Sequence, residues 1–470
     1  MLFRVLSDER RARIAFAVLD LLEGVGVKLT EAQARELLHG AGARIEGDRV
    51  HFPADLVQQA LESAPSNIPI YSRHGDRVMD LGGTAAYFGA HTDAPDVLDP
   101  ETGVRRPCTE ADAGRIARLI DALENLSYTT ASGMLSDRPA AVADRVSLAQ
   151  CLLQSSKPVM AMPVTLQALV DAREMVALAV GGEAVLRERP ALIIYAEPVS
   201  PLLHPDDSIR KLLCCAEHGI PVVYSAFAAM GGTAPMSPSA IIVQLCAESL
   251  SALVVHQLKR PGAPFIFGGM ASIMDMKTTI FSYGAPEFQR GNALMAEMAR
   301  HFDLPNFGTA GTSDAQILDG QAVLEAASSC MMACLTGANL VHDVGLLGNA
   351  TVVMPAMIVA TSEIISMLHQ LLEPVAVGDE DLALDVIRQV GPGGEFVTHQ
   401  HTFEHFGDVW YPGLLYRGGA ETWEASDRRF EDRVSARACE LMERHEPEPL
   451  PAGVARAINA VVTRAEASLP

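Results

Sequence analysis

Eight short apolar segments recur at nearly even spacing through the middle of the chain. They begin near Ala86, Ser127, Pro158, Ala191, Pro221, Pro264, Pro305 and Asn339. Successive starting points are separated by 41, 31, 33, 30, 43, 41 and 34 residues. None of the segments alternates between polar and apolar positions, which is typical of parallel strands that are buried on both faces. Four of them open with proline, which is tolerated at the first residue of a strand.

Helical patterns lie between these segments. The clearest follows Thr109, a predicted N-cap with Asp112 three residues further on. Further helices are expected over residues 140–153, 166–180, 207–217, 239–258, 286–302, 314–335 and 354–372. Eight strands that are each followed by a helix predict an α/β fold, a (β/α)8 TIM barrel. An open doubly wound sheet is the alternative, and it is disfavoured because the repeats are even and no Gly-x-Gly-x-x-Gly follows the first strand.

The two flanks of the chain do not share this spacing. Residues 1–66 read as two helices, a hairpin-like stretch and a third helix, and residues 68–81 read as a second hairpin. After residue 372 come an acidic turn, a segment rich in glycine, histidine and aromatic residues over 391–416, and two charged helices. We therefore expect three parts. They are an N-terminal helical and hairpin extension over 1–82, the barrel over 83–375, and a lid-like C-terminal helical and loop extension over 376–470.

Composition narrows the functional classes. Of the 470 residues, 49% are hydrophobic, and 58 acidic side chains outnumber 36 basic ones for a net charge of -22. Such a chain is not intrinsically disordered, and its acidity disfavours nucleic acid or anionic membrane as a partner. The N-terminus is interrupted by charges, unlike a signal peptide, and the eight cysteines form no Cys-x-x-Cys pair. We therefore expect a soluble, cytoplasmic protein.

The barrel prediction selects candidate site residues, because such barrels build their active sites at the carboxyl ends of the strands. We select His342 and Asp343 as catalytic candidates, since they directly follow two apolar strand residues. The alternative for His342 is a buried histidine held by the backbone, and for Glu197 an ion pair with a structural arginine. The residues selected as substrate-binding candidates are His91, Asp93, Glu197, Tyr224, Thr312 and Asp314.

Other chemistries have little support in the sequence. His399 and His401 have zinc-like spacing, but they lie beyond the eighth strand and lack an identified third ligand, so we predict no metal site. Neither a phosphate-binding loop of the Walker type nor a Gly-x-Ser-x-Gly elbow is present. Nucleophilic catalysis by serine or cysteine is therefore not expected.

Four stretches of the sequence resemble the trimethylamine methyltransferase family. They are Asp99–Leu123, Asp275–Gln289, Gly308–Ala327 and Gly337–Gly345, in that order, and the resemblance extends over nearly the whole chain. It implies a (β/α)8 barrel that transfers a methyl group from a methylamine to the Co(I) corrinoid of a separate small protein. The founding trimethylamine enzymes contain pyrrolysine, which this sequence lacks. The resemblance therefore points to the branch that is similar to glycine betaine methyltransferase and to relatives acting on other quaternary amines.

A quaternary ammonium substrate fits a barrel mouth without an obvious triad. The amine leaves as a neutral tertiary amine, so no general acid is required, and the enzyme supplies desolvation and in-line placement. Aromatic faces or carboxylates would hold the cation, with Glu197, Asp93 or Asp343 facing it and His342 or backbone N–H groups facing a betaine carboxylate. The aromatic candidates are Tyr87, Tyr128, Tyr195, Tyr224, Phe267 and Tyr283.

The expected partners follow from the same resemblance. The Asp-x-His-x-x-Gly cobalt-ligand motif of many corrinoid carriers is absent, since Ala216 stands where the aspartate before His218 would be. We therefore expect no tightly bound cofactor, a corrinoid (cobalamin) presented by a carrier protein, and a homo-oligomeric enzyme. Two alternatives remain open. One is a metal-dependent barrel hydrolase using His91, His342, His399 and His401, and the other is a non-catalytic barrel that binds quaternary amines.

Overall fold

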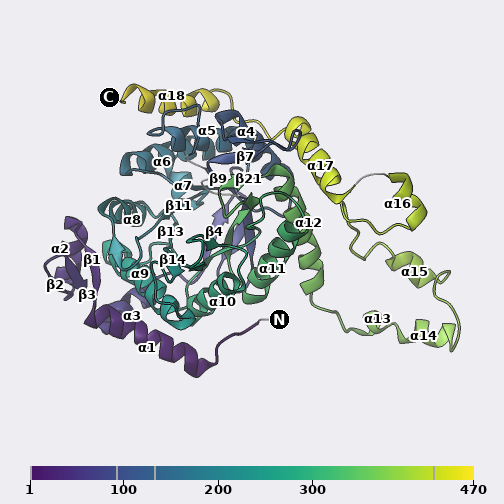
Figure 1. Cartoon of the computed structure of the whole chain (residues 1–470), viewed down its shortest axis with the longest axis horizontal. Coiled ribbons are helices and arrows are strands. Elements are labelled where there is room, and N and C mark those ends of the chain that lie inside the picture. Colours follow the sequence, from purple (N-terminus) through teal and green to yellow (C-terminus); the bar gives the residue numbers. More distant parts are fainter. Residues whose placement is uncertain (1–2, 91–93, 132–133, 427–428, 470) are drawn as a thin grey trace.

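A closed barrel of eight parallel strands forms the centre of the protein (Figure 1). The structure is a computed structural model that describes residues 3–90, 94–131, 134–426 and 429–469. In spatial and chain order the strands are β6 (Tyr87–Ala90), β9 (Thr129–Ala131), β10 (Val159–Ala161), β11 (Leu192–Ala196), β13 (Val222–Tyr224), β15 (Phe265–Gly268), β18 (Asn306–Thr309) and β19 (Leu340–Val344). A parallel bridge between Gly89 and Tyr128 closes the ring. All eight predicted strands and the predicted barrel are confirmed.

Helices surround the strands, as the sequence predicts. They are α4 (Glu110–Ala122), α5 (Ala143–Gln154), α6 (Leu166–Val180), α7 (Glu183–Glu188), α8 (Asp206–His218), α9 (Pro238–Lys259), α10 (Pro286–His301), α11 (Gly320–Thr336) and α12 (Pro355–Leu372). Thr109 caps α4 through a reciprocal capping box with Asp112. The helices α9 and α12 are long and apolar enough to cross a membrane, but 78% and 61% of their apolar windows are buried inside the protein. Their hydrophobicity is therefore accounted for by core packing.

The N-terminal extension covers one side and one end of the barrel. It comprises α1 (Asp8–Gly24), β1 (Val27–Leu29), α2 (Ala32–Gly40), β2 (Arg44–Glu46), β3 (Arg49–His51) and α3 (Ala54–Ser63), and β1 pairs with the short strand β12 (Leu203–His204). The hairpin of β4 (Ile68–Tyr71) and β5 (Arg77–Leu81) packs its apolar side chains against residues of the barrel interior. Hydrogen bonds join this hairpin and the turn inside it to residues 156 and 190, which precede strands β10 and β11. The hairpin therefore plugs the amino end of the barrel.

Two small sheets that the sequence did not predict stand in the loops after the strands, at the opposite end. One contains β14 (Phe227–Met230), β16 (Met270–Met274) and β17 (Phe281–Ser282). The other contains β7 (Asp96–Leu98), β8 (Arg105–Pro107), β20 (Leu346–Leu347) and β21 (Val352–Val353). They narrow the carboxyl end of the barrel, where the site is expected.

The C-terminal part contains α13 (Asp379–Leu382), α14 (Leu384–Val390), α15 (Gln400–His405), α16 (Ala420–Ser426), α17 (Phe430–Arg444) and α18 (Val454–Ala467). The last two helices pack on the barrel, α17 against α4 and α12, and α18 against α5 and α6. The segment with α13 to α16 instead extends away from the barrel (Figure 1).

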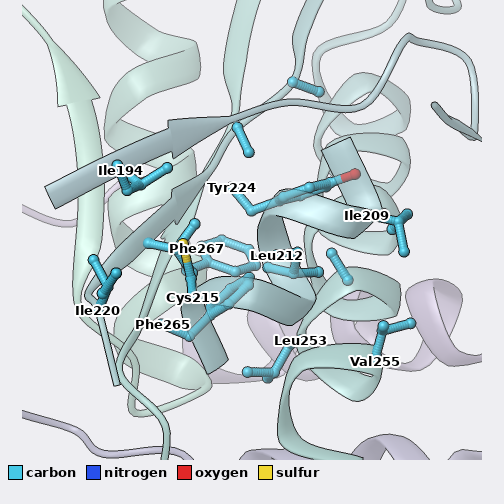
Figure 2. Packing of buried hydrophobic residues seen from close by; sticks show 14 of the residues in the cluster. Ile194, Ile209, Leu212, Cys215, Ile220, Tyr224, Leu253, Val255, Phe265 and Phe267 are labelled. Carbon is cyan, nitrogen blue, oxygen red and sulfur yellow. The ribbon is translucent and has the colours of Figure 1, made fainter. Parts of the chain in front are cut away.

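The main hydrophobic core lies between the strands and the surrounding helices. Figure 2 shows Tyr224 and Phe267 from the strands among Leu212 of α8 and Leu253 of α9. Because successive strand residues point to opposite faces, one set of side chains enters this layer and the other set fills the barrel interior. This alternation decides which residues at the ends of the strands can reach a ligand in the mouth.

Candidate active site at the barrel mouth

Three rings from three strands form a layer inside the barrel: Tyr195 of β11, Phe307 of β18 and His342 of β19. The His342 ring stacks on Phe307 with centroids 4.1 Å apart, and the Phe307 ring lies 5.6 Å from that of Tyr195. All three side chains are buried. They form an aromatic layer inside the barrel near the carboxyl ends of the strands.

His342 and Asp343 face each other although they are neighbours in the chain. Consecutive residues of a regular strand point to opposite faces, but Asp343 has a φ of 77° and the pairing of β19 with β6 shifts register between Val341 and Val344. Aspartate tolerates this left-handed conformation better than most residues. The carboxylate Oδ2 of Asp343 therefore lies 3.1 Å from Nε2 of His342.

The other ring nitrogen of His342 is also engaged. Nδ1 donates to the carbonyl oxygen of Gly308 at 2.8 Å, and the Thr309 hydroxyl lies 3.4 Å away. The imidazole is thus held between a backbone carbonyl and a carboxylate, with 3% of the residue exposed. The orientation of the ring is set before any ligand binds, as a site residue requires.

Glu197 lies directly above this layer, at the rim of the barrel. The hydroxyl of Tyr195 lies 3.0 Å from Oε2 of Glu197 and 3.1 Å from the carbonyl oxygen of Ser225. Burial raises the pKa of Tyr195, and the negative charge of Glu197 raises it further, so the phenol stays neutral and donates a hydrogen bond. Glu197 itself is exposed, and its carboxylate is therefore oriented at the opening rather than sequestered in the core.

An aromatic group closes the other side of the mouth. Tyr283 lies 6.1 Å from Phe227 and 5.9 Å from Phe281 between ring centroids, and the latter two rings are 4.9 Å apart. Burial raises the pKa of Tyr283, and the charges of Asp343, Asp314 and Glu197 raise it further. The Tyr283 phenol therefore stays neutral at neutral pH.

Asp314 holds the loop that carries Tyr283. One carboxylate oxygen accepts hydrogen bonds from the Tyr283 backbone N–H and the Asn349 side chain, each at 2.9 Å. The other accepts from the Ser282 hydroxyl and from the Gly284 N–H, the latter at 3.1 Å. Both oxygens are therefore occupied by protein donors, and Asp314 fixes the position of the loop that carries Tyr283.

The structure does not bring Tyr224 into the mouth, which corrects its selection as a substrate-binding residue. Its side chain points outward into the layer between strands and helices, where its hydroxyl lies 2.7 Å from Nδ1 of His204. Thr312 is fully buried, and its hydroxyl has no hydrogen-bond partner among the residues that the structure describes. His91 and Asp93 lie outside the described residues.

The structure also divides the aromatic candidates into those that reach the mouth and those that do not. Tyr195 and Tyr283 reach the mouth. Tyr128 fills the barrel interior and donates to the carbonyl of Val341 at 2.8 Å, and Phe267 packs outside the strands against Phe302. Tyr87 is half-buried against the interior cluster. Sequence reasoning missed Phe227, Phe281 and Phe307, although strand alternation would have identified Phe307 as an interior residue.

Of the four histidines that a metal-dependent hydrolase would use, His91 lies outside the described residues, and His399 and His401 lie apart from His342. His399 and His401 belong to the segment around α15, which extends away from the barrel that holds His342 (Figure 1). Among the described residues, no group of three or more histidine, cysteine, aspartate or glutamate side chains has the geometry of a metal site. The described mouth instead combines aromatic faces with carboxylates, an arrangement that binds organic cations.

Comparison with known proteins places this geometry in context. The sequence profile of the trimethylamine methyltransferase (MTTB) family matches residues 1–470. The trimethylamine methyltransferase MttB of Desulfitobacterium hafniense strain DSM 10664 / DCB-2 is 30% identical over 463 residues, covering 98% of this chain and 93% of that protein. The glycine betaine methyltransferase of Desulfitobacterium hafniense strain Y51 is 28% identical over 454 residues, with 95% and 94% covered.

A solved structure supports the fold independently. The crystal structure of the hydroxylamine MtmB complex superposes with a TM-score of 0.51 at 12% identity, covering 93% of this chain and 88% of that one. At this level of identity the similarity concerns the arrangement of the elements alone.

Proposed function

The chain belongs to the trimethylamine methyltransferase family and is a methyltransferase, and we propose that it moves a methyl group from a quaternary amine to the Co(I) corrinoid of a separate carrier protein. Glycine betaine or a related betaine is the proposed methyl donor. The observation that carries this proposal is the whole-chain similarity to a glycine betaine methyltransferase, joined to a mouth that offers rings and carboxylates to a cation.

The charges of the mouth suit a quaternary ammonium group. Such a cation has no N–H to donate, so it is recognised by aromatic faces and by carboxylates at van der Waals distance. We propose that the rings of Tyr195 and Tyr283 and the carboxylates of Glu197 and Asp343 provide this environment. The contact between Tyr195 and Glu197 at 3.0 Å supports the proposal. A betaine also carries a carboxylate, for which backbone N–H groups are the proposed donors, because Gly308 and Asp343 already engage both ring nitrogens of His342.

The reaction asks little acid–base chemistry of the protein. The corrinoid, as the methyl acceptor, supplies the nucleophile. When the bond between nitrogen and the methyl carbon breaks, its electron pair stays on nitrogen and the product is a neutral tertiary amine. No proton moves, so the residues of this chain bind the cation, orient one methyl group outward and exclude water.

The proposal also covers the docking site of the carrier protein, the cofactor content of the enzyme, its compartment and its oligomeric state. The methyl group is presented at the carboxyl end of the barrel, so the carrier is proposed to dock over that end. The enzyme itself is proposed to hold no tightly bound cofactor, to act in the cytoplasm, where strongly reduced acceptors are maintained, and to form a homo-oligomer.

The test is methylation of Co(I) cobalamin by the purified enzyme with glycine betaine, proline betaine, carnitine, trimethylamine and dimethylsulfoniopropionate as separate donors. We expect one betaine to be demethylated and the corrinoid to be methylated in equal amounts. Glu197→Gln should weaken betaine binding by about 10-fold, since it removes one charge facing the cation. Glu36→Gln, at an exposed position of helix α2, is the matched control. Methyl transfer from trimethylamine alone, or none from any donor, would refute the proposal.

A further inference from the structure

The segment between α12 and α17, residues 373–424, is the least buried part of the protein, and we call it the arm. No residue from His369 to Glu424 is buried. The four helices of the arm, α13 to α16, have 4, 7, 6 and 7 residues. Helices of this length are not stable in water without tertiary packing. The arm therefore requires a surface that its own barrel does not provide.

Large apolar side chains are exposed along the arm. Phe403 is 70% exposed and Phe406 is 60% exposed. The other exposed apolar residues are Val375, Val377, Leu382, Leu384, Ile387, Phe396, Val397, Val409, Tyr411, Leu415, Tyr416 and Trp423. So many exposed large apolar side chains in one segment are typical of a site of protein–protein interaction.

The arm leaves the barrel at the end opposite to the active site. The helices of a (β/α)8 barrel run antiparallel to its strands, so the carboxyl end of α12 lies at the amino end of the strands. The arm then returns to α12, where the Trp410 Nε1–H donates to the Ser366 hydroxyl at 2.9 Å and the Leu414 N–H donates to Glu363 at 2.9 Å. A carrier docked at the mouth would not cover a segment anchored in this way.

A groove on the same side of the protein offers a complementary surface. A cavity of about 630 Å³ lies between α10 and α11 and is bordered by the N-terminal residues Phe3 and Val5. Phe3 and Leu324, which both line it, are 44% and 66% exposed. In Figure 1 the N-terminus and α11 lie on the side of the barrel from which the arm extends.

The two surfaces are also complementary in charge. Residues 376–416 of the arm carry a single basic residue, Arg388, against the acidic residues Asp379, Glu380, Asp381, Asp385, Glu395, Glu404 and Asp408. Arg290 lines the groove, and Arg4 stands in the chain between its lining residues Phe3 and Val5. Both arginines are exposed, and neither forms an ion pair within the part of the chain that the structure describes. Glu325, which also lines the groove, is engaged by the Ser313 hydroxyl and the Asp314 N–H. Opposite charges at an interface favour the pairing of the arm with the groove over contacts between surfaces of like charge.

We propose that the arm of one copy of this chain docks in the groove between α10 and α11 of a second copy. Because arm and groove lie on the same side, a two-fold axis between two copies allows each to receive the arm of the other. In such a pair, the apolar side chains of both arms and both grooves become buried in a two-fold symmetric interface.

Sedimentation velocity and light scattering on the full-length enzyme test the proposal. The wild type should contain an even number of copies. Phe403→Asp with Phe406→Asp in the arm, and Leu324→Asp in the groove, should each halve the mass or reduce it further. Because these side chains are exposed in a single copy, the barrel should stay folded. Circular dichroism should therefore change by no more than the loss of the short arm helices, and the melting temperature should fall only by the contribution of association. Val104→Asp, at a position that is 57% exposed and belongs to neither surface, is the matched control and should retain the wild-type mass.

Mixing the two variants separates arm exchange from other contacts. A pair formed by one arm variant and one groove variant still has one intact arm facing one intact groove. The mixture should therefore form mixed pairs at concentrations where each variant alone does not associate. A monomeric wild type, an unchanged mass of either variant, or a mixture that does not associate would each overturn the proposal. So would arm variants that keep their mass but lose binding to the carrier protein.

Discussion

Asp314 offers a direct test of how the mouth is held in shape. Its carboxylate accepts four hydrogen bonds, two of them from the backbone N–H groups of Tyr283 and Gly284. In Asp314→Asn one oxygen becomes an amide that cannot accept, so two donors lose their acceptor. A hydrogen bond to a charged group contributes about 1.5–3 kcal/mol when it is buried. Asp314 is half-buried, so water replaces part of this loss, and we expect about 2 kcal/mol.

The expected consequence is a loop that no longer holds Tyr283 against the mouth. A free-energy change of about 2 kcal/mol is a factor of roughly 30 in the population of the ordered loop, which sets the upper limit for the rise in KM. The rate at saturating amine should change much less, because the loop does not take part in the bond breaking. Steady-state methyl transfer at varied betaine concentration, with saturating corrinoid, separates KM from kcat.

Asp319→Ala is the matched control for this experiment. Asp319 caps α11 by accepting from the backbone N–H groups of Gln321 and Ala322, and its loss costs about 1 kcal/mol without touching the Tyr283 loop. We expect a lower melting temperature for this variant and an unchanged KM. If Asp314→Asn leaves KM within twofold of the wild type, or if both variants raise it equally, the positioning role of Asp314 is refuted.

Three further substitutions address the proposed catalytic pair of His342 and Asp343, the packing of the barrel interior, and the pH dependence of stability. Asp343→Asn keeps a residue that tolerates the positive φ but removes the charge beside His342, so we expect methyl transfer to fall by about 10²-fold with little change in melting temperature. Gly89→Ala places a methyl group against the buried ring of Tyr128 and should destabilise the protein by about 1–3 kcal/mol in urea unfolding. Asp112→Asn should lower the free energy of unfolding by about 1–2 kcal/mol near neutral pH, where the carboxylate of Asp112 forms an ion pair with Arg106.

The stability difference between the wild type and Asp112→Asn depends on pH with a defined sign. Burial acts to raise the pKa of Asp112, but hydrogen bonds from Arg106 and Thr109 outweigh it and hold the pKa below its ordinary value. The stabilisation is therefore present above the unfolded-state pKa of 3.8 and is lost as the pH falls through the lower folded-state pKa. The wild-type and variant unfolding curves should converge in acid, and a gap that persists there would contradict the assignment.

Gly89→Ala has a matched control in the same chain, and Asp343→Asn has an outcome that would contradict its proposed role. Gly40→Ala, in a helix with open space around the added methyl group, should stabilise the protein by about 0.5–1 kcal/mol and so shows that alanine itself is tolerated. For Asp343→Asn, a large loss of melting temperature with no separate loss of rate would favour a structural role for the pair.

Much of the fold was predictable from local patterns. Runs of β-branched and aromatic residues at even spacing identified the eight strands, and the capping signal at Thr109 located the start of α4. Barrel topology then directed attention to Glu197, His342 and Asp343, because the active sites of such barrels lie at one end. Successive strand residues point to opposite faces, so an inward-pointing Val223 implies an outward-pointing Tyr224. This argument would have excluded Tyr224 from the substrate-binding candidates.

The remainder depended on contacts between residues far apart in the chain. Phe227, Phe281 and Tyr283 meet only because β14, β16 and β17 pair into a sheet of short strands, which single-segment patterns do not reveal. The hydrogen bonds of Asp314 come from donors about 30 positions away in the chain. The contact between Asp343 and His342 requires a backbone conformation at Asp343 that no sequence pattern signals.

The sequence by itself determined the order of strands and helices, since periodic burial is a local property of each segment. Only the tertiary structure decided which side chains face the mouth, because loop conformation and strand pairing place them there. It also decided that the segment rich in histidine and aromatic residues leaves the barrel instead of reaching the mouth. The apolar residues of this segment indicate that it packs against another surface. Which surface it packs against depends on where the segment lies in the folded protein.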